Sequence, residues 1–531
     1  MKRSGAGSVS ETVRVELAPL GVSFEVARGA ALANILATQG VEFPCGGAGL
    51  CGGCRVRLLE GVLPPTTRDT QVFTGDEIAA GWRLACHARA ETALKLYVDQ
   101  WTAPILTDHS ALSGSARTGV GIAVDLGTTT IAAQMLDLAR GSVLAVETAL
   151  NPQAAYGADI MNRIRFALTS PDLTPLIRKA VGGLIGKLAA SRQSEVVEVV
   201  LVGNAVMHHL FASLSVEPLS HVPFASPNLG EQRFTPEELN WDLPSGCRIR
   251  FLRCIGGFVG SDILAGIGAV NLAASERLRA LVDLGTNGEI AVGNRDGIRC
   301  ASAAAGPAFE AGSMRMGMRA STGAIHRVSL RDGKLECAVI GDVAPRGICG
   351  SGVVDAAAAG LQCGAILPSG RLAGGAREMA LSAPVTLAQS DIRALQLAKG
   401  AIAAGLRILL NRWGAALEDL EIVYLSGAFG NYMRAESAVR IGLLDVPPER
   451  VVAAGNTALR GAKMALLASV EPAAELEHVS LASDAGFEDI FVDCLAFPSA
   501  EAFARAGSNA SLAADAPGIV SRGSVERRGA G

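Results

Sequence analysis

The chain has 531 residues, of which 49% are apolar and 18% charged, so it has a globular composition and exceeds the length of one ordinary domain. A formal net charge of −4, without long basic runs, argues against nucleic acid as the main partner. No apolar run is long enough for a membrane-spanning helix, and no apolar stretch follows the start MKRSGAGSVSETV as in a secretory signal, so we expect a cytoplasmic chain with no membrane partner.

The first hundred residues predict a compact sheet with one helix across it. Alternation and helical spacing give, in chain order, strands at 11–17 and 22–27, a helix at 31–40, and strands at 54–61 and 93–98. A glycine-rich loop, PCGGAGLCGGC, lies between the helix and the third strand. We therefore place a first domain at residues 1–100.

The composition changes after this domain. Residues 101–118 are polar, with Pro, Ser and Gly, and are predicted to form a linker. From residue 119 onward, apolar strands, glycine turns and helices alternate, which indicates an α/β body. We divide this body into lobes at 119–275 and 276–507 and expect a disordered tail at 508–531, where no periodicity remains.

Four cysteines near the N-terminus have the spacing of metal ligands. The pattern is C-x5-C-x2-C with a fourth cysteine after 31 residues, namely Cys45, Cys51, Cys54 and Cys86. Plant-type ferredoxins hold a [2Fe–2S] cluster with C-x4-C-x2-C and a distant fourth cysteine, one residue tighter than here. Zinc sites usually pair two C-x2-C units, so the isolated Cys86 counts against zinc. A glycine-rich surface loop with chance cysteines is the other alternative.

A strand ending in Asp-Leu-Gly-Thr occurs twice, as DLGTTT at 125–130 and DLGTNG at 283–288. Glycine lets backbone N–H groups approach phosphate oxygens, and threonine hydroxyls add donors. The aspartates need a counter-charge beside phosphate, so we expect them to hold Mg²⁺, either directly or through water. One copy alone would also fit a capped strand end. Two copies, with SGAFG at 426–430 after a third apolar strand, favour two halves that face each other across a cleft.

Three further features are candidates for the same cleft. GICGSG is a glycine turn before a helix, where Gly350, Ser351 and Gly352 would receive a phosphate or ribose, or would simply cap the helix. Asp262 follows a glycine turn that either lines the cleft or only connects a strand to a helix. Glu289 would position water, with a satisfied strand carboxylate as the alternative.

The remaining cysteines and one histidine pair lack such patterns. The seven cysteines from Cys247 to Cys494 show no ligand spacing and are interpreted as buried small hydrophobes. The pair His208–His209 is interpreted as dividing between the two faces of a helix, with a metal role as the alternative.

Residues 11–99, with this cysteine pattern, resemble a β-grasp ferredoxin domain of the adrenodoxin spacing class. The resemblance implies a [2Fe–2S] cluster on the four cysteines and one-electron transfer, often at a potential of about −400 mV. The fold class that we predict is an α+β β-grasp [2Fe–2S] ferredoxin domain followed by a two-lobed α/β ATPase.

The DLGT pair and SGAFG resemble the ASKHA superfamily of acetate and sugar kinases, Hsp70 and actin. The resemblance implies two RNase H-like lobes that close over ATP·Mg²⁺. The residues that match its phosphate loops are Asp125, Gly127, Thr128 and Thr129 in the first and Asp283, Gly285, Thr286 and Asn287 in the second, and Gly427 and Gly430 match its adenosine loop. We expect Asp125, Asp283 and Glu289 to act in catalysis.

The pairing of these domains and the strings VGNAVMHHLF, GGFVGSDILAG, DLGTNGE, AAAGPAFE, GICGSG and LSGAFGNYM resemble the reductive activators of corrinoid proteins, up to about residue 500. This resemblance implies ATP-dependent reduction of an inactive Co(II) corrinoid protein to Co(I), which restores a methyltransferase system. It also implies a ferredoxin or flavin reductase as electron donor, and it permits a homodimer through the ATPase.

The chain departs from longer members of that family in having a linker of about twenty residues, which would span roughly 25 Å if flexible. Three rival functions stay open. The first is a small-molecule kinase regulated by the redox state of the cluster, although no dedicated substrate base is identifiable. The second is a chaperone-like ATPase that changes its affinity for a client. The third is an ATP-driven electron donor to another low-potential acceptor.

Overall fold

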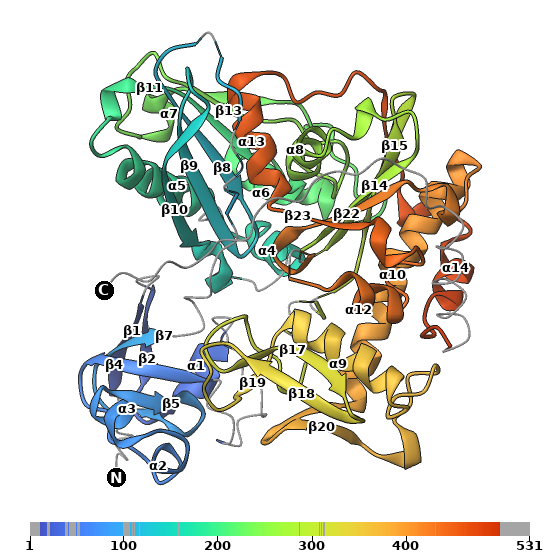
Figure 1. The fold of residues 1–531 in the computed structure, drawn as a ribbon. Helices are drawn as coiled ribbons and strands as arrows, with labels where there is room; N and C mark the ends of the chain where they lie inside the picture. The colour runs from blue at the N-terminus through green and yellow to red at the C-terminus, as the bar shows by residue number, and fades with distance from the viewer. Residues whose placement is uncertain are drawn as a thin grey trace, which may run out of the picture.

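The computed structural model describes residues 11–18, 22–37, 41, 49, 54–98, 107–108, 110, 112–115, 117–156, 160–170, 173–285, 287–306, 308–309, 311, 314–430 and 432–499. Figure 1 shows two lobes, each built on a large sheet, with the N-terminal domain beneath them. A smaller subdomain lies beside the N-terminal domain. Two predicted cluster ligands, Cys45 and Cys51, and the loop residue Thr286 lie outside the described residues.

The N-terminal domain is a five-stranded sheet in the order β2-β1-β7-β4-β5, with short helices beside it. Its elements are β1 (Thr12–Ala18), β2 (Val22–Ala27), β3 (Ala30–Ala31), α1 (Leu32–Ala37), β4 (Arg55–Glu60), α2 (Asp69–Val72), α3 (Gly75–Ala79), β5 (Trp82–Leu84), β6 (Arg89–Ala90) and β7 (Leu94–Val98). The alternating residues Val15 and Leu17 of β1 face Leu36 of α1 and Leu96 of β7 in the core. This is the predicted β-grasp arrangement, with β1 parallel to β7.

The first lobe contains a six-stranded sheet in the order β10-β9-β8-β11-β13-β12. Its elements are β8 (Val120–Leu126), β9 (Thr130–Asp137), β10 (Ser142–Leu150), α4 (Ile160–Ala167), α5 (Leu173–Ala189), β11 (Val196–Val202), α6 (Ala205–Ala212), β12 (Gln232–Phe234), α7 (Pro236–Leu239) and β13 (Arg248–Phe251). Helices α5 and α6 cover one face, where Val181 and Phe211 pack against Val124 and Leu201. Because β8 and β11 are parallel neighbours, the loops that follow them lie side by side.

The second lobe repeats this plan with the strand order β23-β22-β14-β15-β16-β24. Its elements are β14 (Arg279–Leu284), β15 (Gly288–Asn294), β16 (Gly297–Ala303), α10 (Gln389–Trp413), β22 (Ile422–Ser426), α11 (Gly427–Gly430), α12 (Ala435–Arg440), β23 (Val451–Gly455), β24 (Leu476–His478) and α14 (Phe487–Asp493). The parallel ladder of β14 and β22 pairs Asp283 with Ser426. The second DLGT loop therefore lies beside the SGAFG segment.

Two helices, α8 (Ser261–Ala269) and α13 (Thr457–Leu467), lie between the two large sheets (Figure 1). Helix α13 follows β23 of the second lobe, yet its Leu459 and Leu466 pack against Ala123 and Val200 of the first. A Cβ on Gly461 would lie 2.1 Å from the carbonyl oxygen of Ala265, so α8 and α13 are in backbone contact there. Close packing of these helices fixes how the loops after β8 and β14 face each other.

A small subdomain of the second lobe lies next to the N-terminal domain, in yellow and orange in Figure 1. It contains β17 (Ala324–Arg331), β18 (Lys334–Val339), β19 (Gly347–Ile348), α9 (Gly350–Gln362), β20 (Glu378–Ser382) and β21 (Val385–Ala388). Among the residues described, no helix combines the length and apolar character needed to cross a membrane.

The described part of the segment predicted as a linker is held against the first lobe and α13. The ammonium of Lys463 on α13, which is fully buried, forms an ion pair with Asp108 and bonds the carbonyl of Ser110 at 3.1 Å. Gln134 of β9 donates to the carbonyl of Asp108 at 2.6 Å, and the amide of Ser115 donates to the carbonyl of Leu138. The unanchored chain between the last strand of the N-terminal domain and Asp108 therefore has fewer residues than the predicted linker of about twenty.

Candidate functional site

Four carboxyl groups influence one another where the two lobes meet. They are Asp125 at the end of β8, Asp262 in the first turn of α8, Asp283 at the end of β14, and Glu289 on β15. Burial, then the negative charges of Asp283 and Asp125, raise the pKa of Asp262 to about 8. Burial and the charges of Asp262 and Asp283 raise the pKa of Glu289 well above its usual value. Without a cation these groups therefore favour their neutral forms, and a bound cation would stabilise the ionised ones.

Asp125 is tied to the opposite lobe by a hydrogen bond. The side-chain amide of Asn456, which caps the N-terminus of α13, donates to Asp125 Oδ2 at 2.8 Å. Burial raises the pKa of Asp125 to about 6 and the charge of Asp283 adds to this, while the Asn456 bond acts in the opposite direction. This bond favours the ionised form, which is the form that a cation or its water shell requires.

Asp283 is positioned by the SGAFG segment. The hydroxyl of Ser426 donates to Asp283 Oδ2 at 2.6 Å. A Cβ on Gly427 would lie 2.7 Å from Asp283 Oδ1, and Gly427 has a φ of +85°, so the position requires glycine on both counts. Burial raises the pKa of Asp283, whereas the Ser426 bond lowers it. The predicted adenosine loop and the second phosphate loop thus form one structural unit.

The first phosphate loop is held by two asparagines. Asn151, which is fully buried, donates from Nδ2 to the carbonyl of Gly127 at 2.9 Å, and its backbone N–H donates to the carbonyl of Thr129 at 2.8 Å. Asn204 caps α6 and donates from Nδ2 to the hydroxyl of Thr128 at 2.9 Å. These bonds fix both ends of the turn, so its N–H groups are preorganised for an anion.

The second phosphate loop is a tight turn between β14 and β15. The N–H of Gly285 donates to the carbonyl of Asn287 at 3.1 Å. Antiparallel pairing places Leu284 opposite Gly288, and a Cβ on Gly288 would lie 2.5 Å from Ile402 of α10. Backbone of this kind can approach a phosphate closely.

The GICGSG segment is closely packed at the start of α9. Gly350, Ser351 and Gly352 are all buried. The hydroxyl of Ser351 donates to the carbonyl of His326 at 3.0 Å, and a Cβ on Gly352 would lie 2.2 Å from the carbonyl of Ile325. These contacts account for the small residues by helix–sheet packing, and a phosphate or ribose role for them stays a prediction.

The carboxyl groups do not by themselves form a cation cage. Within the described part of the chain, no three His, Cys, Asp or Glu side chains are placed to hold a metal ion together. Mg²⁺ usually keeps several of its waters and takes one or two carboxylates together with substrate phosphates. Asp125 and Asp283 fit that mode, since each is a carboxylate at a strand end that is oriented by one hydrogen bond to its Oδ2.

The cysteine site is described in part, through Cys54 and Cys86. The N–H of Ala85 donates to the carbonyl of Cys54 at 3.1 Å, so the two cysteines belong to adjoining turns of the domain. Cys54 is buried and Cys86 packs against the same core. A Cβ on Gly49, whose φ is +68°, would lie 2.5 Å from Nε2 of His87. This close backbone approach requires glycine and fits a loop wrapped around a cluster.

Sequence reasoning missed the asparagines that hold the loops, namely Asn151, Asn204 and Asn456. Each follows a strand or begins a helix, and that position was the only signal available. His208 and His209 are both buried on α6 rather than divided between two faces. Nε2 of His209 bonds the hydroxyl of Ser226 at 2.6 Å, and Nε2 of His208 bonds the carbonyl of Gly230 at 3.1 Å, as structural histidines do.

The scattered cysteines occupy the places predicted for them in most cases. Cys247, Cys254, Cys300, Cys349 and Cys494 are buried, whereas Cys337 is half-buried and Cys363 is exposed. Burial raises the pKa of the Cys247 and Cys300 thiols to about 12 in each case, so neither is a thiolate ligand as it stands.

Comparisons with known proteins agree with this geometry. The profile described as 2Fe-2S iron-sulfur cluster binding domain matches residues 15–91. The profile described as RACo middle region matches 120–275, and that of the C-terminal domain of RACo, the ASKHA domain, matches 277–506. The N-terminal domain is therefore a [2Fe–2S] cluster domain, and the body is of the ASKHA type that binds ATP.

Two curated proteins and one solved structure are similar along most of the chain. Corrinoid activation enzyme RamQ from Eubacterium limosum is 33% identical over 414 residues, which cover 70% of this chain and 69% of that protein. The [Co(II) methylated amine-specific corrinoid protein] reductase from Methanosarcina barkeri is 28% identical over 422 residues, with coverage of 70% and 76%. The structure of a reductive activator for corrinoid, iron-sulfur protein superposes with a TM-score of 0.62 at 25% identity and covers 92% of this chain and 98% of that one.

Proposed function

This chain belongs to the family of reductive activators of corrinoid proteins, and on that premise we propose that it reduces an inactive Co(II) corrinoid protein to Co(I) at the expense of ATP. One electron passes from the N-terminal domain to cobalt, and a methyltransferase system regains its active carrier. The observation that carries the proposal is the presence, in one chain, of a cysteine site and an acidic site whose carboxylates are held by one hydrogen bond between the lobes, from Asn456 to Asp125, and one within the second lobe, from Ser426 to Asp283.

The N-terminal domain supplies the electron. A [2Fe–2S] cluster bound by Cys45, Cys51, Cys54 and Cys86 would provide one-electron chemistry at a low potential. The buried surroundings of Cys54 exclude water from one side of the site. Two arginines of the domain, Arg55 and Arg83, are also largely buried, and Arg55 directly follows Cys54 in the chain.

The ATPase supplies the driving force. Asn151 and Asn204 hold the first loop so that the N–H groups near Gly127 meet phosphate oxygens. Asp125 and Asp283 would hold Mg²⁺, and Glu289 would orient the attacking water. Each 59 mV of unfavourable one-electron transfer lowers the equilibrium constant about tenfold, and different affinities of two nucleotide states for the partner offset that factor.

Three finer assignments belong to the same proposal. An external ferredoxin or flavin reductase reloads the N-terminal domain, two copies of the chain pair through their ATPase lobes, and the reaction takes place in the cytoplasm, where thiols stay reduced. Sedimentation of the purified protein tests the pairing, and a single-copy mass at micromolar concentration would refute it.

The experiment that tests the function mixes the iron-loaded protein, a low-potential reductant and a Co(II) corrinoid protein, with and without ATP. The absorption band of Co(I) should form in the complete mixture and stay near background without ATP. Equal Co(I) formation in both mixtures would refute the proposal. ATP-dependent phosphorylation of a small acceptor without any corrinoid would favour the redox-regulated kinase instead.

A further inference from the structure

The N-terminal domain is attached to the second-lobe subdomain by an ion pair between Glu77 and Arg346. Glu77 lies on α3, and its Oε1 accepts from Arg346 Nη2 at 3.1 Å, with side-chain exposures of 26% and 14%. Such a contact between domains is mostly removed from solvent, so salt and water weaken it less than they weaken surface pairs. The pair joins Glu77, which lies near the cysteine site, to Arg346, which lies shortly before the first residue of α9.

Glu77 also accepts hydrogen bonds within its own domain. Its Oε1 also accepts from Arg55 Nη1 at 3.4 Å, and its Oε2 accepts from the N–H of Thr74 at 3.0 Å in a capping box. The guanidinium of Arg55 lies 3.7 Å from the ring centre of Trp82. Since Arg55 follows Cys54, the carboxylate of Glu77 links the cysteine site to the ATPase through two side chains.

Arg346 begins a continuous path to the nucleotide loops. Its backbone N–H donates to the carbonyl of Gly323 at 2.7 Å, and the next two residues form β19, which pairs with β17 and leads into α9. In α9, the buried Asp355 accepts from Nε of Arg434 at 3.0 Å and from the hydroxyl of Ser437 at 2.6 Å. Arg434 immediately precedes α12, and α12 follows the SGAFG segment that holds Asp283.

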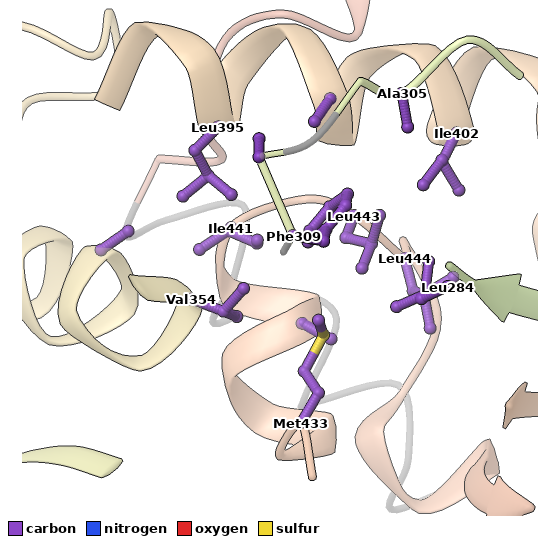
Figure 2. Close-up of a cluster of buried hydrophobic side chains, with 14 of the residues drawn as sticks. Leu284, Ala305, Phe309, Val354, Leu395, Ile402, Met433, Ile441, Leu443 and Leu444 are labelled. Atoms are coloured by element: carbon purple, nitrogen blue, oxygen red, sulfur yellow. The ribbon is translucent and has the colours of Figure 1, made fainter. Parts of the chain in front are cut away.

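Packing along this path is tight. Figure 2 shows Val354 of α9, Met433, Ile441 and Phe309 in one apolar cluster with Leu284 of β14, and all five are buried. Close-packed cores transmit displacements rather than absorb them. A shift of the SGAFG segment on nucleotide binding would therefore move α12, α9 and Arg346 together.

From these contacts, and resting on the proposed function for the nucleotide itself, we propose that the Glu77–Arg346 pair is a latch that docks the [2Fe–2S] domain on the ATPase and that nucleotide binding opens. At 3.1 Å the pair already exceeds the usual length of a charge-assisted hydrogen bond, so a displacement of Arg346 away from Glu77 weakens it further. The connection is short: nine residues separate Val98 from Asp108, where the Lys463 anchor begins, and an extended chain of this length spans at most about 35 Å. Opening thus frees the domain to turn while keeping it beside the ATPase.

The coupling between nucleotide binding and the latch acts equally in both directions, so nucleotide affinity tests the proposal. If nucleotide weakens the latch, removing the latch must tighten nucleotide binding by the same factor. Arg346→Ala in the full, iron-loaded chain should therefore bind a non-hydrolysable ATP analogue with Mg²⁺ at least about fivefold more tightly than the parent, the lower end of usual couplings. Arg331→Ala is the matched control, because Arg331 forms an ion pair inside the same subdomain, with Glu336 at 3.3 Å.

Hydrogen exchange of the amides at 75–81 reports docking independently, since these residues lie in the other domain. Exchange should rise when the parent binds the analogue, and it should be high with and without analogue in Arg346→Ala; Arg346→Lys should restore part of the protection. Unchanged exchange in Arg346→Ala, or an affinity equal to or lower than that of the parent, would overturn the proposal. If the parent bound no analogue, the proposed function would fail, while exchange in the nucleotide-free proteins would still decide whether Arg346 docks the domain.

Discussion

The side-chain amide of Asn456 donates a hydrogen bond to the carboxylate of Asp125 over 2.8 Å, although 331 residues separate them in the sequence. Asn456 also accepts from the N–H of Leu459 and so caps α13. One side chain therefore connects the first DLGT loop to α13, the helix that follows β23 of the second lobe. A hydrogen bond to an ionised group contributes more than one between neutral groups.

Two different replacements of Asn456 should weaken nucleotide binding by different amounts. Asn456→Ser keeps a capping hydroxyl but is too short to reach Asp125, and we expect about a tenfold loss of Mg²⁺-nucleotide affinity at neutral pH, the equivalent of about 1.4 kcal/mol. Asn456→Asp keeps the cap but opposes Asp125 with a like charge, and should cost more. Titration calorimetry measures both, and equal affinity in the parent and Asn456→Asp would contradict the role of this bond.

The acidic site predicts a stability that falls with rising pH. The pKa values of Asp125 and Asp262 are raised to about 6 and about 8, so their protons are held in the folded state when the unfolded chain has already lost them. Stability without nucleotide should decrease between about pH 6 and pH 8, because a raised carboxyl pKa makes ionisation oppose folding. Thermal unfolding across this range measures the effect.

Two controls make the pH prediction specific to the site. Asp262→Asn, a neutral isostere, should remove the part of the slope near pH 8. Saturating Mg²⁺-nucleotide should flatten the slope, because the bound cation offsets the carboxylate charges. A slope identical in the parent and Asp262→Asn would show that other groups cause it. His208, whose pKa burial lowers to about 4, acts in the opposite direction: it makes stability rise with pH until its unfolded imidazole has lost its proton, near pH 6.5, and it therefore cannot cause a fall toward pH 8.

The cluster ligands predict a spectroscopic result. Cys54→Ser should remove the visible absorption of the [2Fe–2S] centre while leaving nucleotide affinity within about twofold of the parent. Cys247→Ser is the matched control, since Cys247 is also buried but packs in the first lobe, and it should keep the full spectrum. An unchanged spectrum in Cys54→Ser would remove this cysteine from the ligand set.

The anchored linker predicts a local loss of protection. Lys463→Met removes the cation paired with Asp108, and breaking a pair this well buried costs about 3 kcal/mol. The amides at 107–115 should then exchange about 100-fold faster, whereas Lys187→Met, on the exposed face of α5, should leave them unchanged. Equal rates in both variants would show that the anchor does not depend on Lys463.

The sequence was informative where a pattern is local. The alternation of strands and helices predicted an α/β body, and the two DLGT loops placed Asp125 and Asp283 at strand ends, because those signals lie within a few residues. Hydrogen bonds and ion pairs between distant segments have no comparable local pattern in the sequence. The Asn456–Asp125 and Arg346–Glu77 contacts depend on how lobes and domains come together, and periodicity does not encode that.

The linker also shows that contacts between distant segments cannot be predicted from local composition. Its polar, glycine-containing sequence is typical of a flexible connection, yet Lys463 and Gln134 hold part of it through backbone carbonyl groups. Backbone acceptors are present in every residue, so composition cannot reveal which of them a distant side chain will bond.

The most direct test of the account is Co(I) formation by the Asp283→Asn variant, loaded with iron and reduced before mixing with a Co(II) corrinoid protein and ATP. Asparagine keeps the size of the side chain and an acceptor for the Ser426 hydroxyl but lacks the charge that Mg²⁺ requires. The account predicts a normal reduced cluster spectrum, with ATP hydrolysis and Co(I) formation lowered at least about 100-fold. Co(I) formation at the parent rate would contradict the claim that nucleotide turnover drives the electron to cobalt.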